Sequence, residues 1–184
     1  MGSMKVGKMV AVQEAIPNLI GQGYTHVLWA DGFDTFLRHD EPRIMSSYMD
    51  YGSPGILFSG EKNCWPDPGV AELYPQSAYP WRFINAGTWM AEISYLKNAL
   101  ESVIAFSGSE EDDQRLWTRA FLGGILPTSK IDASCSIFQT MWETNLSEIA
   151  DPAVVHYNGG VWRNAQDRRY IEHWERTRAE LIGE

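Results

Sequence analysis

The sequence lacks a long hydrophobic run. No apolar stretch approaches the ~20 residues that a membrane-spanning helix needs. The first residues, Met1–Lys5, contain no hydrophobic core of a signal peptide. These absences argue against a membrane protein. We therefore expect a cytoplasmic protein, or a segment cut from something longer.

Cysteine is scarce as well. The only two cysteines, Cys64 and Cys135, form neither a Cys-x-x-Cys pair nor a zinc-binding spacing. We expect both to be small buried side chains in a reducing compartment. A disulfide between them stays open, although nothing in the sequence requires one.

Positive charge is in short supply, with 15 Lys and Arg against 24 Asp and Glu and a formal net charge of −9. This balance argues against a nucleic-acid partner, because the phosphates would be repelled. It leaves room for a phosphate ligand, since a divalent cation placed between carboxylates and phosphate dominates the local charge.

Apolar periodicity and turn residues predict helices that alternate with short buried strands. Helices are expected at residues 8–22, 42–49, 94–106, 112–122 and 164–182, and strands at 26–30, 55–59, 82–84, 88–91, 130–132, 136–138 and 153–156. No repeat, low-complexity tract or linker divides the chain, so we expect one domain over residues 1–184. The alternation indicates an α/β fold, with a sheet of mixed strand directions flanked by helices.

The predicted strand at 26–30 ends in the turn Asp31-Gly-Phe-Asp34. In α/β sheets, ligands collect beyond the carboxyl ends of strands. Two carboxylates there can converge on one hard cation such as Mg²⁺ or Mn²⁺, which leaves positions for phosphate oxygens and water. The alternative is that one Asp caps the turn and the other is solvated.

A second candidate is His156, at the end of an apolar segment and followed by Tyr157, Asn158 and two glycines. Its imidazole could add a metal ligand while amides of the following loop meet a phosphate. The alternative is a histidine that is satisfied within the fold before an Asn-Gly turn.

Four consecutive acidic residues, Glu110–Asp113, open a predicted helix. The helix dipole favours acidic residues at this end, so capping accounts for some of them. Four exceed what capping needs. A carboxylate held near a sugar could instead orient an acceptor hydroxyl or act as a general base.

In combination, these motifs resemble the glycosyltransferase domain of the procollagen lysyl hydroxylases and its relatives among the collagen galactosyl- and glucosyltransferases. Six segments match in the family's order between residues 5 and 160. They are Val27–Asp34, Ile56–Glu61 with Cys64–Pro66, Arg82–Gly87, Asp112–Gln114, Ile131-Asp132 with Ile137–Gln139, and His156–Gly159.

The resemblance implies a GT-A type fold, a UDP-sugar donor, Mn²⁺ (or Mg²⁺) as the cofactor, and a hydroxyl-bearing glycan or protein as the acceptor. It also implies roles for residues of this chain. They are Asp31, Asp34 and His156 for the metal, Asn158 and Gly159 beside the diphosphate, Trp65 and Asn85 in the sugar pocket, and Asp112 and Asp113 as catalytic carboxylates near the transferred sugar.

The chain departs from the family's pattern in three places. Tyr157 stands where the family usually has Gly, and the acidic run before Gln114 is shorter. GT-A domains also begin with a strand and loop that recognise uracil and ribose, whereas here a single helix precedes the strand at 26–30. We therefore expect a GT-A-like sheet that is N-terminally truncated, with an open edge that would favour a homo-oligomer.

The sequence leaves three functions open. The first is metal-dependent transfer of a hexose from a UDP-sugar to a hydroxyl acceptor. The second is a non-catalytic metal- or glycan-binding remnant of that fold. The third is a metal-dependent phosphohydrolase that uses the same Asp pair.

Overall fold

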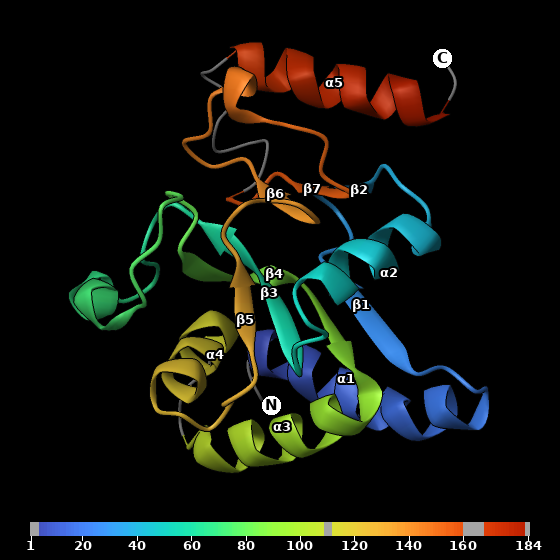
Figure 1. The fold of residues 1–184 in the computed structure, drawn as a ribbon, viewed down its shortest axis with the longest axis vertical. Coiled ribbons are helices and arrows are strands. Elements are labelled where there is room, and N and C mark those ends of the chain that lie inside the picture. Colours follow the sequence, from blue (N-terminus) through green and yellow to red (C-terminus); the bar gives the residue numbers. More distant parts are fainter. Residues whose placement is uncertain (1–3, 109–111, 160–167, 183–184) are drawn as a thin grey trace.

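A four-stranded mixed sheet lies at the centre of the protein, seen in a computed structural model that describes residues 4–108, 112–159 and 168–182 (Figure 1). Its strands, in spatial order, are β1 (His26–Ala30), β4 (Phe83–Glu92), β3 (Ile56–Glu61) and β5 (Lys130–Asp132). Strand β4 runs antiparallel to both of its neighbours, and β5 runs parallel to β3.

A smaller three-stranded sheet lies beyond one end of the central sheet (Figure 1). It contains β2 (Thr35–Leu37), β7 (Val154–His156) and β6 (Phe138–Thr140), in that order. Strand β7 is antiparallel to β2 and parallel to β6. The structure therefore has two mixed sheets where the sequence predicted one.

Helices cover both sheets. Helices α1 (Met4–Gly21), α3 (Ile93–Phe106) and α4 (Asp113–Leu122) share one apolar core with the central sheet. Helix α2 (Glu41–Asp50) packs on a second core that includes residues of β3, β4, β6 and β7. Helix α5 (Arg168–Ile182) lies across the smaller sheet (Figure 1), and two short 3-10 helices span Pro68–Leu73 and Leu146–Glu148.

The apolar stripes of the sequence account for the main core. Leu96, Leu100 and Val103 project from one face of α3 at helical spacing, and all three are fully buried. The Trp117 ring of α4 packs against Phe58 of β3, with centroids 5.3 Å apart. Burial of such side chains stabilises the fold by about 1.5–3 kcal/mol each.

Three predicted strand segments are corrected by the structure. Segments 82–84 and 88–91 form one ten-residue strand, β4, because β1 and β3 pair with it from both sides. This pairing outweighs the weak strand preference of the intervening Asn85 and Gly87. The strand expected at 136–138 is displaced to β6, because the pairing with β7 begins only at Phe138, and the amides of Ser136 and Ile137 bind the Asp132 carboxylate instead.

Other boundaries differ in detail. Strand β2 has only three residues and no pattern of its own, so sequence periodicity missed it. Strand β1 was expected to be buried, but all five of its residues are half-buried because no other described strand pairs with its outer edge. The helix expected at 164–182 begins at Arg168 in the structure, and residues 164–167 lie outside the described ranges.

Both cysteines are free thiols; Cys135 is buried, whereas Cys64 is only half-buried. Among the described helices, none combines the length and the apolar character needed to cross a membrane.

We predict that Asp132 is a major support of the connection between β5 and β6. Its fully buried side chain accepts hydrogen bonds from the amides of Ser136, Ile137 and Phe138 and from the Tyr51 hydroxyl. Asp132→Ala would leave buried donors without an acceptor, at a cost of about 3 kcal/mol or more in the free energy of unfolding. Chemical denaturation would measure this loss. Asp50→Ala, at an exposed position, is the control, and equal stability of the two variants would contradict the prediction.

Candidate functional site

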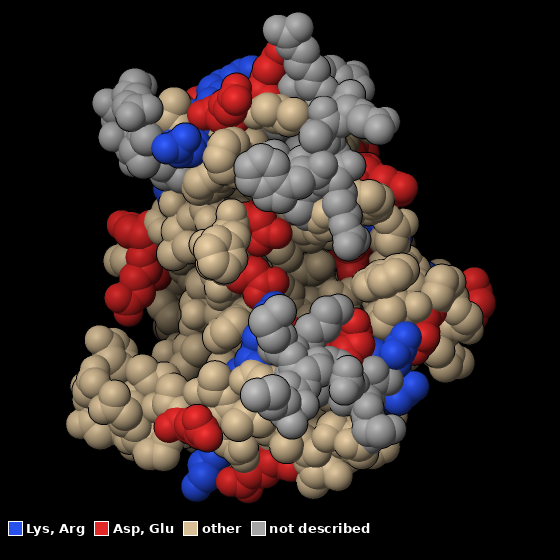
Figure 2. Space-filling model, turned by 180° about the vertical axis from the view of Figure 1, so that it is seen from behind, with Lys and Arg blue, Asp and Glu red and all other residues tan. Residues whose placement is uncertain are grey.

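A pocket of about 580 Å³ opens where the carboxyl end of β1, the middle of β4, the start of α4 and the loop after β7 meet. Acidic side chains border a hollow near the middle of the face shown in Figure 2. All nine site residues predicted from the sequence line the pocket. They are Asp31, Asp34, Trp65, Asn85, Asp112, Asp113, His156, Asn158 and Gly159.

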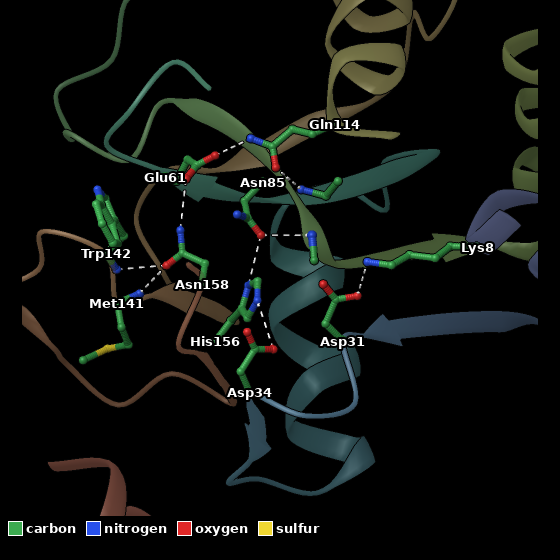
Figure 3. A network of polar contacts seen from close by, with 12 residues as sticks. Lys8, Asp31, Asp34, Glu61, Asn85, Gln114, Met141, Trp142, His156 and Asn158 are labelled. Carbon is green, nitrogen blue, oxygen red and sulfur yellow. Dashed lines mark hydrogen bonds and ion pairs between the residues drawn. The ribbon is translucent and has the colours of Figure 1, made fainter. Parts of the chain in front are cut away.

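Asp31, Asp34 and His156 form a group of three that could hold a metal ion. Each offers a ligand atom, and these atoms all lie within 4.8 Å of one another. The turn after β1 carries the two carboxylates, and pairing of Thr35 with His156 places the imidazole beside them. His156 Nε2 lies 3.5 Å from the nearer Asp34 oxygen (Figure 3).

The hydrogen bonds of Asn85 define which nitrogen of His156 faces this group. Asn85 Oδ1 accepts from the Gly87 amide at 3.0 Å and lies 3.0 Å from His156 Nδ1. Because this oxygen is an acceptor, Nδ1 donates to it, and Nε2 is the nitrogen that faces Asp34 (Figure 3). A neutral imidazole and two carboxylates are ligands that suit Mn²⁺, and Mg²⁺ shares the carboxylate preference.

Gly87 provides the space in which the imidazole ring lies. A Cβ atom at this position would lie 2.1 Å from Cε1 of His156, which is far closer than atoms can approach. The ring is almost fully buried, so it has little room to move away. Glycine at position 87 is therefore a requirement of the His156 orientation.

Lys8 is a site residue that sequence reasoning missed. Its Nζ lies 2.7 Å from Asp31 Oδ1 (Figure 3). The same atom lies 3.8 Å from Asp113 Oδ2. Burial lowers the pKa of Lys8, but the hydrogen bond to Asp31 and the nearby carboxylate charges outweigh it and raise the pKa. The carboxylates thus already attract one cation, as expected of a metal-binding group.

Glu61 is the second residue that was missed, although its segment matched the family pattern. It is only 5% exposed, and its two oxygens accept hydrogen bonds from the side-chain amides of Gln114 and Asn158 (Figure 3). Burial raises its pKa to about 7, against the opposing effect of these hydrogen bonds. Glu61 thereby connects β3 to the start of α4 and to the loop after β7.

The two amides that bind Glu61 each contact further segments. Gln114 Oε1 accepts from the Ala86 amide, and its Nε2 also donates to the Trp65 carbonyl at 2.9 Å. Asn158 Oδ1 accepts from the amides of Met141 and Trp142. The side chain of Asn158 therefore shapes the pocket wall, with Gly159 next to it at a φ of +85°.

The acidic run at the start of α4 combines capping with a position in the pocket. Asp112 is the N-cap of α4 and accepts from the Arg115 amide at 3.0 Å, as the capping alternative expects. Asp113 faces Lys8, as described above. Glu110 and Glu111, which belong to the same run, lie outside the described residues. So does Gly160, the second of the two glycines after Asn158.

Trp65 lies at the edge of the pocket with 61% of its surface exposed. Its backbone is held by Gln114, and a cis peptide joins it to Pro66. An exposed aromatic ring with a fixed backbone offers a flat apolar surface to a ligand in the pocket.

The chain matches the family model described as PLOD GT domain over residues 2–164. It is 25% identical over 174 residues to a procollagen-lysine,2-oxoglutarate 5-dioxygenase of Drosophila melanogaster. The matched region covers 83% of this chain and 24% of that protein. It is 28% identical over 136 residues to the human multifunctional procollagen lysine hydroxylase and glycosyltransferase LH3, covering 72% of this chain and 17% of that protein. The chain thus spans a quarter or less of the length of these relatives.

Among solved structures, the chain is similar to a glycosyltransferase involved in the glycosylation of the major capsid of PBCV-1. The TM-score is 0.56 at 15% identity, with 92% of this chain and 74% of that chain covered. At this identity the likeness concerns the fold alone. It confirms the predicted GT-A-like α/β class.

We predict that Gly87→Ala displaces the His156 ring. The added methyl group has no space, so overpacking should lower the free energy of unfolding by about 1–3 kcal/mol. Chemical denaturation and the NMR signals of the His156 ring would measure the two effects. Gly69→Ala is the matched control, because nothing lies within 4 Å of its Cβ position. A Gly87→Ala protein that behaves like Gly69→Ala would refute the steric argument.

We predict that the Glu61 carboxyl titrates near neutral pH, since burial raises its pKa from 4.5 to about 7. The folded protein then holds this proton more tightly than the unfolded chain. The stabilisation is complete below pH 4.5 and is lost as the pH rises through about 7. Carboxyl ¹³C NMR would report the pKa. Between pH 5 and pH 8, wild type should lose on the order of 2 kcal/mol more than Glu61→Gln. A carboxyl that titrates near its ordinary value would contradict this.

Proposed function

The chain belongs to the PLOD glycosyltransferase (GT) domain family, and from that premise we propose that it transfers a hexose from a UDP-sugar to a hydroxyl group of a glycan or protein. We further propose that Asp31, Asp34 and His156 hold the Mn²⁺ or Mg²⁺ ion that the reaction uses. One observation carries the proposal: three ligand atoms within 4.8 Å of one another, in the wall of a pocket of about 580 Å³. Pockets of roughly 300–1,000 Å³ are typical of small-molecule sites.

The residues present fit a divalent cation. Asn85 keeps the proton of His156 on Nδ1 and leaves Nε2 for coordination, and Asp31 already binds the ammonium group of Lys8. When bound, the cation would neutralise the donor diphosphate and the charge that develops on the departing UDP.

The other pocket residues would bind and orient the two substrates. Asn158 and Gly159 line the pocket together with the proposed metal ligands, and the backbone amides of this loop would meet the diphosphate. Trp65 and Asn85 would contact the sugar, with the exposed indole ring stacking on its C–H face.

The start of α4 is the proposed position of the acceptor. Asp112 and Asp113 line the same pocket, and a carboxylate there can orient a hydroxyl or accept its proton as the new bond forms. Lys8 offsets the charge of Asp113, so this carboxylate can lie close to the metal ligands without strong repulsion.

Two expectations from the sequence remain predictions. One is the cytoplasmic location. The other is pairing of two copies through the outer edge of β1, which is half-buried and bonded only to β4 among the described strands.

We predict that binding of UDP requires the metal group. Titration calorimetry of UDP with and without Mn²⁺ would measure this, and a transfer assay with UDP-hexoses would follow for wild type and Asp34→Asn. Losing one carboxylate ligand should weaken Mn²⁺-dependent UDP binding by more than about tenfold, a cost of at least about 1.4 kcal/mol. Asp50→Asn, at an exposed position, should match wild type.

The outcomes separate the three functions. Absence of Mn²⁺-dependent UDP binding would sink the transferase proposal. Binding without transfer to any hydroxyl acceptor would favour a non-catalytic remnant. Release of free phosphate without sugar transfer would favour a phosphohydrolase.

A further inference from the structure

Tyr157 lies between two residues of the proposed site, His156 and Asn158, yet its side chain points away from the pocket. It is fully buried, and its hydroxyl lies 2.7 Å from His173 Nδ1 and 3.3 Å from Thr177 Oγ1. Both partners belong to α5. This residue therefore connects the loop of the site to the C-terminal helix.

The same residue is bonded to the turn that carries the carboxylates. The Tyr157 amide donates to the Asp34 carbonyl at 2.8 Å, which extends the pairing of β7 with β2 by one bond. Its ring contacts Phe36 of β2 edge-on at 5.9 Å, and Phe36 in turn lies 5.9 Å from the Trp174 ring of α5. Helix α5 thus packs against both strands from which Asp34 and His156 extend.

These two strands are too short to hold their own register firmly. Strands β2 and β7 have three residues each, and a pair of such strands is at best marginally stable without a packed face. Met141, Val155 and Tyr157 form the small core under α5. Helix α5 therefore adds a packed face to the pair, beside the support that β7 receives from β6 and from the core under α2.

We propose that α5 is a brace that holds Asp34 and His156 in place, and that Tyr157 is the positioning residue through which it acts. The inference rests on the proposed function, because it assigns a metal to that pair. The helix spans Arg168–Ile182 and so lies outside residues 2–164, which match the family model.

Conservative substitutions test the brace without removing the helix. Tyr157→Phe deletes only the hydroxyl, and Thr177→Val deletes one of its partners on α5. Tyr74→Phe is the matched control, because its buried hydroxyl bonds Thr118 at 3.0 Å in the main core. All variants are compared at a temperature at which denaturation curves show each to be folded.

The first measurement needs no metal. Hydrogen exchange of the Tyr157 amide, which donates to Asp34, should accelerate about tenfold in Tyr157→Phe and Thr177→Val but not in Tyr74→Phe. The double variant Tyr157→Phe/Thr177→Val should exchange little faster than Tyr157→Phe alone, because the loss of the Tyr157 hydroxyl already removes its contact with Thr177. Unchanged exchange at this amide in both Tyr157→Phe and Thr177→Val would overturn the brace.

The second measurement is Mn²⁺ affinity, by electron paramagnetic resonance of the free ion. Outer partners of metal ligands change affinity by roughly 10–100-fold, and we expect the lower end of that range for Tyr157→Phe. Tyr74→Phe should stay within about twofold of wild type. If wild type binds Mn²⁺ and Tyr157→Phe binds it equally well, the brace is wrong and the proposed function stands. If wild type binds no Mn²⁺, the proposed function fails, and the positioning role fails with it.

Discussion

The crowding of carboxylates around one pocket is the constraint on which the rest of the structure depends. Asp31 and Asp113 lie on different elements and share the Lys8 ammonium, with Asp34 close to Asp31. Like charges at such distances repel, and partial burial strengthens that repulsion. A divalent cation between Asp31 and Asp34 would offset more of this charge than the single ammonium group of Lys8 does. The grouping of carboxylates is the physical basis of the proposed metal site.

Hydrogen bonds determine how the side chains of the pocket are oriented. Asn85 sets the tautomer of His156, and Glu61 holds two amides whose remaining bonds reach β4, the loop after β3 and the loop after β6. In a buried network of this kind each bond supports the others, so displacement of one member is transmitted to the rest. Burial of the Glu61 carboxyl costs charge solvation, but it joins several segments that are distant in sequence into one pocket wall.

The smaller sheet positions two residues of the site, although it lies beside the central sheet. Strand β2 begins one residue after Asp34, and strand β7 ends at His156. Two of the three proposed ligands therefore depend on a pair of short strands and on the helix that covers them. This dependence connects the C-terminal helix, through Tyr157, to the chemistry proposed for a pocket that the helix does not line.

The sequence by itself determined most elements, the α/β class and the nine residues that meet in the pocket. Helix and strand periodicities and capping act over a few residues, which is why β1, β5 and the start of α4 could be predicted almost to the residue. Only the tertiary structure decided that the sheet divides in two, that Lys8 meets Asp31 across 23 residues and that His156 meets Asn85 across 71. It also decided that Glu61 is buried between two amides. These facts depend on which elements stack on one another, and no local pattern encodes that, because the energy of such contacts arises only when distant segments exclude water together.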